Sequence, residues 1–245
     1  MTISSEFEGT QVLVVGGTSG IGAAIGAAFI RSGATVTITG ATEAECEAAR
    51  SAPAMAAARV QRVDVRDGDA VAACVAGHHA LKVLVNCAGV IRRGAELDPV
   101  VFAEVIDINL NGVMRTCAAA RPLLKAHGGC IINTASMLSF FGGGVVPAYS
   151  ASKGGVAQLT KSLAIAYAAD GIRVNAVAPG WIATPLTQAL QDDPARAAPI
   201  LARTPMGRWG TPADVAGPVL FLASPSAAAF VTGVVLPVDG GYLIT

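Results

Sequence analysis

The chain has 245 residues, of which 53% are hydrophobic and 14% are charged, whereas about 25% of the residues in an ordinary globular protein are charged. Its formal net charge is zero and it contains no basic run, which argues against nucleic acid and anionic membranes as partners. So little charge indicates that much of the chain is buried on both sides, either in a helix-covered parallel sheet or in a large subunit interface.

Membrane insertion, secretion and metal binding are also disfavoured. The uncharged stretches 128–152 and 216–238 contain proline, glycine and serine turn signals, so neither suits a membrane-spanning helix. The first eight residues lack a basic region followed by an apolar core, so we expect no secretory signal. The five cysteines form no CxxC pair, and the three histidines lack metal-ligand spacing. We therefore expect a cytoplasmic protein with reduced thiols and no metal.

Strand-like and helix-like segments alternate along the chain. This alternation predicts an α/β fold with a doubly wound parallel sheet of about seven strands, right-handed crossovers and helices on both faces. No repeat, linker or low-complexity segment divides the chain, so we expect a single domain over residues 1–245. The predicted strands are 11–15, 35–39, 59–64, 81–86, 129–135, 172–178 and 233–238, and the predicted helices lie near 20–32, 43–50, 67–76, 99–126, 147–169 and 211–223.

The first strand leads directly into a glycine cluster. Its apolar residues 11–15 are followed by Gly16, Gly20 and Gly22 and then by a helical pattern. Glycines there permit a tight turn, close approach of the backbone to a pyrophosphate, and close packing of helix on strand. The amides at the start of the helix then face the phosphates. The order of strand, glycines and helix therefore predicts a dinucleotide site.

The end of the second strand is where NAD and NADP are distinguished in sites of this kind. An acid at the position of Gly40 would bind the ribose 2′-hydroxyl and repel a 2′-phosphate. An arginine at Ala41 or Ser19 would hold that phosphate. Neither is present. The cofactor is therefore NAD or NADP, with a slight preference for NAD because a phosphate without a cation loses its strongest contacts.

A tyrosine, a lysine and a serine are the candidate chemical groups. Tyr149 and Lys153 are four residues apart in the helical segment 147–169, so their side chains lie on one face. An ammonium beside a phenol lowers a pKa that is ordinarily about 10. Ser136 directly follows the apolar segment 129–135, where its hydroxyl can hold a carbonyl oxygen beside the tyrosine. Alone, this tyrosine–lysine spacing more often marks the surface of an amphipathic helix, and the glycine cluster changes that balance.

Five motifs in this order resemble those of the short-chain dehydrogenase/reductase family over the whole chain. Val15 and Cys87 depart from the pattern, since the family usually has threonine and a second asparagine there. The resemblance implies a Rossmann fold, an NAD(P)-dependent oxidoreductase that acts on CH–OH groups, and a homotetramer. The motifs are Gly16-x-x-x-Gly20-x-Gly22, Asn86-Cys-Ala-Gly89, Ser136, Tyr149-x-x-x-Lys153 and Pro179-Gly180.

The resemblance also implies roles for particular residues. Tyr149 is the general acid/base, Lys153 lowers its pKa and holds the nicotinamide ribose, and Ser136 orients the substrate oxygen. Asn109 positions a water that links Lys153 to solvent, although an asparagine there is equally an ordinary helix cap or kink. Asp64 contacts the adenine amino group and Val65 its ring. The implied cofactor residues are Gly16, Thr18, Ser19, Gly20, Ile21, Gly22, Asp64, Val65, Asn86, Ala88, Gly89, Tyr149, Lys153, Pro179, Gly180, Ile182 and Thr184.

Residues 182–209 form the least regular segment and contain four prolines. They follow a predicted strand end, where the ligand crevices of such sheets form. We expect a substrate lid there, although an ordinary surface excursion explains this composition equally well.

Several segments resemble the sugar-acid dehydrogenases of the family, namely 89–93, 135–140, 207–210 and 238–241. A guanidinium pairs bidentately with a carboxylate. Arg92, Arg93 and Arg208 are therefore candidate anchors for a sugar acid, although each is equally compatible with a solvated position or a subunit contact.

Two other functions are weighed against this one. Reductases of 3-oxoacyl thioesters share the scaffold, but a chain without net charge offers little basic surface for an acyl carrier protein. A non-catalytic cofactor-binding sensor typically lacks the tyrosine or the lysine, and both are present. The apolar helices 99–126 and 147–169 and the segment 230–243 carry more hydrophobic surface than one sheet face needs, which also favours a homotetramer.

Overall fold

The computed structural model describes residues 6–245, which are organised by one seven-stranded sheet. All neighbouring strands pair in parallel, in the order β3-β2-β1-β4-β5-β6-β7, as the alternation predicts. The order reverses between β1 and β4, and ligands of such sheets bind at the carboxyl ends of the strands near this point. The strands are β1 (Gln11–Val15), β2 (Thr35–Gly40), β3 (Arg59–Arg62), β4 (Leu81–Asn86), β5 (Cys130–Thr134), β6 (Arg173–Pro179) and β7 (Val235–Val238).

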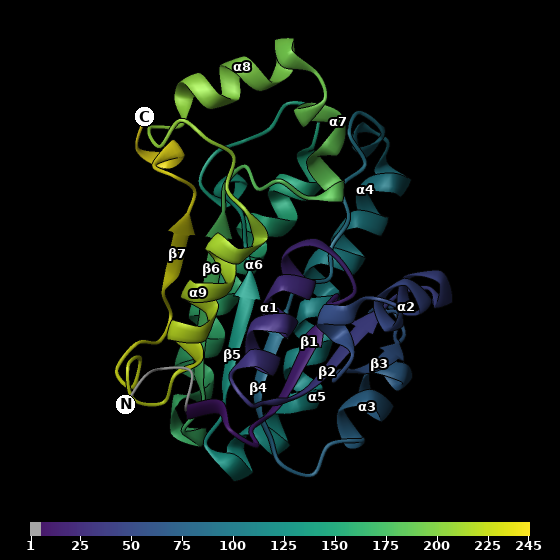
Figure 1. Cartoon of the computed structure of the whole chain (residues 1–245), viewed down its shortest axis with the longest axis vertical. Helices are drawn as coiled ribbons and strands as arrows, with labels where there is room; N and C mark the ends of the chain where they lie inside the picture. The colour runs from purple at the N-terminus through teal and green to yellow at the C-terminus, as the bar shows by residue number, and fades with distance from the viewer. Residues whose placement is uncertain (1–5) are drawn as a thin grey trace.

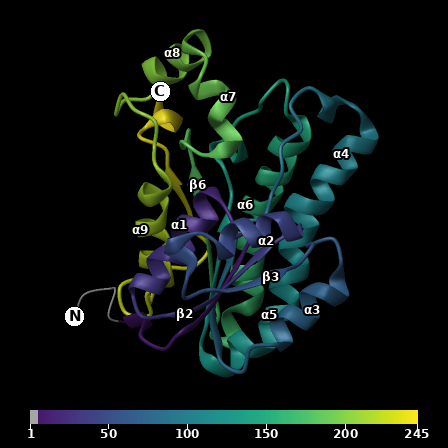
Figure 2. The same cartoon turned by 45° about the vertical axis from the view of Figure 1, so that its right-hand side comes forward.

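Helices cover both faces of the sheet, as Figures 1 and 2 show. On one face α1 packs against α9 and α2 lies beside β2 and β3, while α3, α4, α5 and α6 cover the other face. The helices are α1 (Gly20–Arg31), α2 (Glu43–Arg50), α3 (Gly68–Ala76), α4 (Pro99–Ile106), α5 (Gly112–His127), α6 (Pro147–Tyr167), α7 (Gln188–Gln191), α8 (Pro194–Arg203) and α9 (Pro212–Ala223).

The strands are apolar throughout because both of their faces are buried. In β1, Val12 and Val14 belong to the core under α1 and α9, whereas Leu13 and Val15 belong to the core under α5 and α6. Val15, which departs from the family pattern, is 3% exposed and fills this second core. Continuous hydrophobic strands of this kind are expected in parallel sheets covered on both sides.

Two predicted elements differ from the structure. The segment 99–126 is not one helix, because a π-helical turn at Asp107–Asn111 separates α4 from α5. The segment 182–209, predicted to be irregular, contains a short 3-10 turn (Pro185–Thr187) followed by α7 and α8. Its prolines misled the prediction because Pro185 and Pro194 stand in first turns, where the missing N–H costs no hydrogen bond.

The helices α7 and α8 lie above the carboxyl ends of the strands (Figure 1). The carboxyl ends of the strands therefore lie between the glycine loop that follows β1 and this helical segment. Within residues 6–245, no helix has the length and hydrophobicity needed to cross a membrane, and no group of three or more potential metal ligands occurs.

Candidate active site

The glycine loop packs directly against the end of β4. Gly16 has a φ of +77°, and a methyl group on it would lie 2.4 Å from the backbone nitrogen of Ala88. A methyl group on Gly22 would lie 2.1 Å from the carbonyl oxygen of Gly16. At Gly20, a methyl group would lie 3.5 Å from Cγ2 of Thr184, so the segment that follows β6 also borders the loop. Sterics therefore demand glycine where the sequence predicts a phosphate cradle.

The start of α1 completes this cradle. Ser19 is the N-cap residue in an extended conformation, and its side chain makes no capping hydrogen bond to the helix among the described residues. The amides of the first turn, which begins at Gly20 and Ile21, thus keep their capacity to bind an anion. Thr18 lies beside the end of β2, where a methyl group on Gly40 would be 2.8 Å from its Cγ2. These residues fit the diphosphate and adenosine portions of a dinucleotide.

An acidic side chain that the sequence reasoning missed lies at the end of β2. Glu45 accepts hydrogen bonds through Oε2 from the amides of Ala41, at 2.7 Å, and Thr42, at 3.2 Å. It closes a capping box at the start of α2. Its Cβ would also lie 3.2 Å from a methyl group on Gly40. The side chain of Glu45 therefore lies beside the position at which an acid would bind the ribose 2′-hydroxyl. The capping-box spacing from Thr42 to Glu45 was the available signal.

Three predicted cofactor residues are engaged mainly within the protein. The carboxylate of Asp64 forms a bidentate ion pair with Arg66. The hydrogen bonds from Arg66 lower the pKa of Asp64. The amide of Asn86 donates to Oδ1 of Asn133 at 2.9 Å and is 3% exposed. Val65 is 5% exposed and belongs to the core. Their geometry favours contacts with a cofactor through backbone atoms, or through the lone pairs that Asp64 still offers.

Cys87, the second departure from the family pattern, is a thiol inside the site's wall. Its Sγ lies 3.3 Å from Oγ1 of Thr134, at the end of β5. Burial raises the pKa of Cys87 to about 11, so the group is a neutral thiol at physiological pH. It therefore fills space between two strands and supplies no charge.

Lys153 is buried at the carboxyl end of β5. It is 4% exposed, and its Nζ donates to the carbonyl oxygen of Thr134 at 2.7 Å. Burial lowers the pKa of Lys153 to about 8. Its Nζ is 5.6 Å from the centroid of the Tyr149 ring, so the helical spacing does place both residues on one face of α6.

Several groups of the protein act on the pKa of Tyr149. Burial raises it above its ordinary value, the Ser136 side chain lowers it, Arg93 lowers it further, and Glu96 raises it. Lys153 is not among the groups that set it in the protein alone. The lowering of this pKa by Lys153 stays a prediction, since the Lys153 ammonium binds the carbonyl oxygen of Thr134 and the cation that lowers the pKa of the phenol in the protein alone is Arg93.

Ser136 is held next to α6 by the turn that follows β5. It caps the 3-10 turn Met137–Ser139, accepting a hydrogen bond from the amide of Leu138 at 3.1 Å. In the same turn, Oγ of Ser139 donates to the backbone carbonyl of Lys153 at 2.7 Å. These bonds fix the serine relative to the helix that carries Tyr149 and Lys153. The structure thus brings together three of the four residues predicted to be catalytic, namely Ser136, Tyr149 and Lys153.

Asn109 lies in the π-helical turn and is fully buried. Its Oδ1 accepts from the amide of Val90 at 2.8 Å, and its Nδ2 donates to the carbonyl of Val90 at 2.9 Å and to Oγ of Ser152 at 3.1 Å. A methyl group on Gly89 would be 3.3 Å from its Oδ1 and 3.6 Å from Nζ of Lys153. Asn109 thus lies near Lys153, but its side chain is used to hold the loop after β4.

The three arginines predicted as substrate anchors have different surroundings. Arg208 makes a bidentate ion pair with Asp214 at 2.8 and 3.1 Å, and Arg92 lies 3.8 Å from Glu104. Within residues 6–245, no carboxylate lies within ion-pair distance of Arg93. Partial desolvation lowers the pKa of Arg93, and the charge of Arg196 on α8 lowers it further.

The charges of Arg93, on the loop after β4, and Arg196, on α8, therefore act on one another. Sequence reasoning missed Arg196 because it lies in the segment predicted to be irregular. Two interacting guanidiniums that form no ion pair among residues 6–245 favour the binding of an anion.

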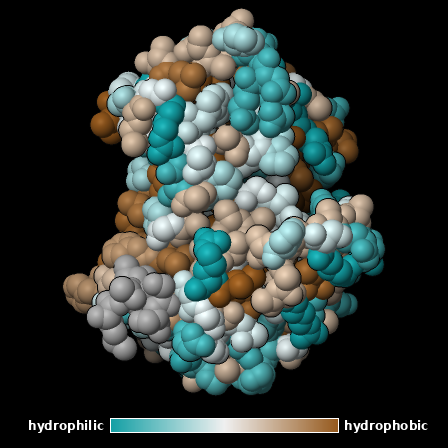
Figure 3. All heavy atoms as spheres, viewed as in Figure 1, coloured by the Kyte–Doolittle hydropathy of each residue, from teal (hydrophilic) through white to brown (hydrophobic). Residues whose placement is uncertain are grey.

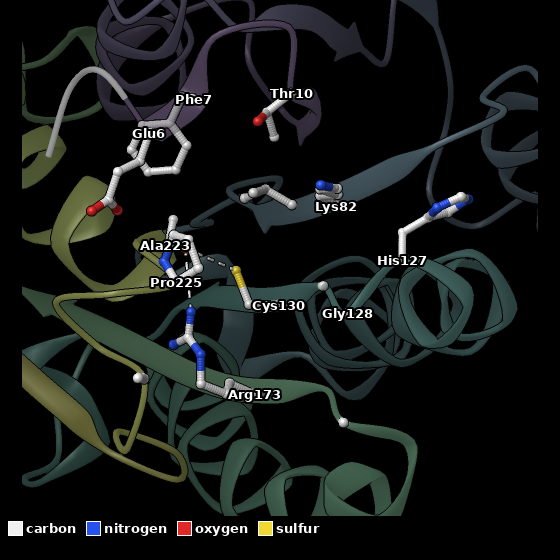
Figure 4. Close-up of a pocket in the computed structure, with 14 residues that line it drawn as sticks. Glu6, Phe7, Thr10, Lys82, His127, Gly128, Cys130, Arg173, Ala223 and Pro225 are labelled. Carbon is white, nitrogen blue, oxygen red and sulfur yellow. Dashed lines mark hydrogen bonds between the residues drawn. The ribbon is translucent and has the colours of Figure 1, made fainter.

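The predicted catalytic residues line neither of two cavities in the protein. One of about 300 Å³ is bordered by Lys82, Cys130 and Arg173, at the amino ends of β4, β5 and β6, and Figure 4 shows it. Because the strands are parallel, this cavity is at the opposite edge of the sheet from Tyr149. The other, of about 550 Å³, lies between Trp181, Arg208 and the end of β7. Arg208 therefore lines a cavity that the predicted catalytic residues do not border.

Comparison with known proteins shows similarity over nearly the whole chain. A family model described as Enoyl-(Acyl carrier protein) reductase matches residues 15–243. The chain is 41% identical to the 2-dehydro-3-deoxy-D-gluconate 5-dehydrogenase of Bacillus subtilis over 246 residues, covering 96% of this chain and 95% of that protein. It is 44% identical to the cis-4-hydroxycyclohexanecarboxylate dehydrogenase of Sinomonas cyclohexanicum over 240 residues, covering 94% and 95%.

A solved structure gives the same result for the fold. The crystal structure of a candidate NAD(P)-dependent gluconate 5-dehydrogenase from Beutenbergia cavernae, with NADP bound at low occupancy, superposes with a TM-score of 0.90. It is 41% identical and covers 99% of this chain and 100% of that one. The resemblance to sugar-acid dehydrogenases found in the sequence is thereby confirmed as a similarity.

Proposed function

This chain belongs to the short-chain dehydrogenase/reductase family, and from that premise we propose that it transfers hydride between a nicotinamide cofactor and a secondary alcohol or ketone of a (deoxy)keto sugar acid. As a member of that family it is an NAD(P)-dependent oxidoreductase that acts on CH–OH groups. The observation that carries the substrate proposal is Arg93, whose guanidinium has no carboxylate within ion-pair distance among residues 6–245 and whose charge acts on Tyr149.

In the proposed mechanism, the nicotinamide supplies the acceptor or donor of hydride. Tyr149 exchanges a proton with the substrate oxygen. Ser136 holds that oxygen beside the phenol, in the position that the 136–139 turn fixes. Lys153 uses one N–H to bind Thr134 and keeps two for the nicotinamide ribose. Asn109 supports this arrangement by holding the loop at Val90 beside Lys153.

The names of the two relatives support a carboxylate-bearing substrate. The Bacillus enzyme is named for 2-dehydro-3-deoxy-D-gluconate, and the Sinomonas enzyme for cis-4-hydroxycyclohexanecarboxylate. These molecules differ in their carbon skeletons, but each carries a carboxylate at a distance from the reacting carbon. An enzyme that acts on such substrates needs a cation near the phenol to bind the carboxylate.

We propose NAD rather than NADP as the preferred cofactor. Glu45 places a carboxylate at the end of β2, where the adenosine ribose binds in dinucleotide folds. A carboxylate there accepts a hydrogen bond from a 2′-hydroxyl and repels a 2′-phosphate. The bound NADP of the Beutenbergia protein is a property of that protein.

The segment 182–209 is proposed as a substrate lid, with α8 carrying Arg196 toward Arg93.

We also propose a cytoplasmic homotetramer. The five cysteines are unpaired thiols, which suits a reducing compartment. β7 is the last strand of the sheet and pairs on one side with β6, and apolar residues lie along the side formed by β7 and α9 (Figure 3). Phe230, Ile244 and Ile165 are more than four-fifths exposed, which favours burial between subunits.

Absorbance of the reduced nicotinamide, followed with a panel of sugar acids, matched neutral polyols and 3-oxoacyl thioesters, tests the function with both cofactors. We expect turnover of sugar acids and little turnover of thioesters. The Tyr149→Phe variant should lose about 10²- to 10⁴-fold in turnover while retaining cofactor affinity. Turnover restricted to thioesters would refute the substrate class, and near-native turnover in the Tyr149→Phe variant would refute the assignment of the phenol.

A further inference from the structure

A buried carboxylate that the mechanism above does not use links the two sides of the candidate site. Glu96, in the 3-10 turn Ala95–Leu97 after β4, is 1% exposed. Its Oε1 accepts from the amide of Arg92 at 2.7 Å, and its Oε2 accepts from the amide of Tyr149 at 2.9 Å. Within residues 6–245, no lysine or arginine side chain lies within ion-pair distance of it. The charge of Glu96 also acts on Arg93 in the same turn, but the hydrogen bonds to its carboxylate come from backbone amides. Burial of a carboxylate held in this way is costly, which calls for a reason to retain it.

The first partner of Glu96 belongs to the helix that carries the phenol. α6 begins at Pro147, and its N-cap residue Val146 has no side-chain oxygen with which to cap the helix. Glu96 instead caps the helix from another part of the chain, at the amide of Tyr149 itself. A carboxylate at a helix N-terminus also interacts favourably with the helix dipole. The position of the first turn of α6, and so of the phenol, depends on this contact.

The second partner belongs to the loop that carries the substrate-side cation. The amide of Arg92 binds the carboxylate, and the amide of Glu96 donates back to the carbonyl of Arg92 at 3.0 Å. Arg93 is the next residue of this closed turn. A separate bond from the amide of Gly94 to the carbonyl of Val145, at 2.8 Å, joins the same two segments. One side chain thus sets the spacing between the cation and the phenol.

The charge of Glu96 also reaches the phenol, and its effect is opposed by other groups. Burial is the largest influence that raises the pKa of Tyr149, and Glu96 raises it further. Ser136 from the turn after β5 and Arg93 from the loop after β4 lower it. Lys153 faces the ring from α6 itself, and Arg196 from α8 acts on Arg93.

We propose that Glu96 is the positioning residue of this active site, a buried carboxylate that holds the backbone of Tyr149 and the Arg92–Arg93 turn at the separation needed for a substrate carboxylate and its reacting carbon. The inference rests on the proposed function for its substrate, but the contacts that carry it do not. It predicts that loss of the carboxylate impairs turnover and shifts the ionisation of the phenol together.

The Glu96→Gln variant tests this inference. Glutamine keeps the shape of the side chain but offers one acceptor and one NH₂ group, so one of the two amides loses its partner. We expect kcat for alcohol oxidation to fall about 10- to 100-fold, because small displacements of a reacting group have effects of this size. Activity in this direction rises with pH as the phenol ionises. Removal of the negative charge should therefore move the midpoint of that rise to lower pH.

The matched control is Glu104→Gln, which removes an exposed carboxylate from the same neighbourhood, 3.8 Å from the Arg92 guanidinium. It should leave kcat and the midpoint unchanged. The affinity for reduced cofactor, measured by nicotinamide fluorescence, should be unchanged in both variants. A Glu96→Gln variant with native kcat, or one whose loss of kcat comes with an unshifted midpoint and a lowered melting temperature, refutes the positioning role.

A second readout requires no substrate. Titration of tyrosinate absorbance, taken as the difference between each protein and its Tyr149→Phe counterpart, reports the phenol alone. We expect its midpoint at lower pH in Glu96→Gln than in the native chain, and an identical midpoint in the two proteins overturns the inference. Because this titration is independent of turnover, its outcome stays interpretable even if the sugar-acid panel fails and the proposed function falls.

Discussion

The two sides of the carboxyl edge of the sheet are built differently. On the side of β1 and β2, the proposed cofactor cradle is shaped by backbone, because Gly16 and Gly22 leave no room for a methyl group. On the side of β4 and α8, the proposed substrate site is shaped by charged side chains, with Arg93 and Arg196 unpaired among the described residues and Glu96 held on amides. One side is fixed by steric exclusion and the other by electrostatics.

This difference suggests which changes each side tolerates. A steric cradle is intolerant of any added atom and indifferent to remote charge. A site built from long charged side chains accepts changes of volume but responds to each change of charge and to pH. Added atoms should therefore have their largest effects on the first side, and changes of charge on the second.

The largest effect should come from Gly22→Ala. Its methyl group would lie 2.1 Å from the carbonyl oxygen of Gly16, and only movement of the loop can relieve this contact. We expect the dissociation constants of NADH and NADPH to rise together by about 100-fold, measured by nicotinamide fluorescence.

Gly217→Ala is the control, since nothing lies within 4 Å of the added methyl group in α9. It should bind both cofactors normally and gain slightly in stability from its helical position. If Gly22→Ala binds as the native chain does, the cradle is not set by backbone contact, and the contrast between the two sides disappears.

Lys153, which lies between the two sides, should show a stability cost that depends on pH. Burial lowers its pKa to about 8 in the folded protein, against about 10.4 in an unfolded chain. Between these values the unfolded chain binds one more proton than the folded one, so the free energy of unfolding rises with pH across this window. Below pH 8 the buried charge destabilises the fold.

The Lys153→Met variant should therefore be more stable than the native chain at pH 7, by about 2 kcal/mol after loss of the bond to Thr134. This gain should shrink as the pH rises from 8 to 10. Urea unfolding at several pH values measures it. A methionine variant that is less stable than the native chain at pH 7 would show that the ammonium is not desolvated as described.

The cofactor side could be predicted from the sequence because its requirements are local. Gly16 and Gly22 are needed by the backbone wherever a strand, a tight turn and a helix follow one another. The same holds for Tyr149 and Lys153, since helical periodicity alone places them on one face. The parallel sheet followed from apolar strands that alternate with helices.

The substrate side could not be predicted in the same way, because its properties arise from contacts between distant segments. Arg92 and Arg93 are adjacent in sequence, but only the fold shows that one lies near Glu104 and the other acts on Tyr149. The π-helical turn around Asn109 leaves no periodic signal. Helical spacing points to Lys153 as the cation beside the phenol, but only the fold shows that burial, the Ser136 side chain and Arg93 also act on the pKa of Tyr149.

Arg93→Ala tests the electrostatic side directly. Removal of the unpaired guanidinium should raise KM for sugar acids about 10- to 50-fold, as expected for loss of a charge-assisted hydrogen bond, with neutral polyols much less affected. Arg92→Ala and Arg208→Ala should each change KM less than threefold, since their guanidiniums already face Glu104 and Asp214. Equal effects of all three substitutions would mean that pairing in the structure does not identify the anchor.

The smallest effect should come from Glu45→Gln, a change of charge on the steric side. Glutamine can still cap the amides of Ala41 and Thr42 through its oxygen, so the end of β2 should keep its shape. Loss of the negative charge at an exposed site contributes about 1 kcal/mol at most. The ratio of the NADPH to the NADH dissociation constant should therefore fall about three- to fivefold, while the constant for NADH changes little.

Glu47→Gln is the matched control, because that exposed carboxylate pairs with Arg50 on the same helix. Fluorescence titrations at low and high salt separate the charge effect from a change in loop shape, since only the first is screened. We expect the ratio to fall in Glu45→Gln but not in Glu47→Gln, and the ratios of Glu45→Gln and the native chain to become equal at high salt. This result would show that the carboxylate beside Gly40 discriminates between the two cofactors. An unchanged ratio would mean that the cradle selects its dinucleotide by backbone shape alone, which would make the steric account of this side complete.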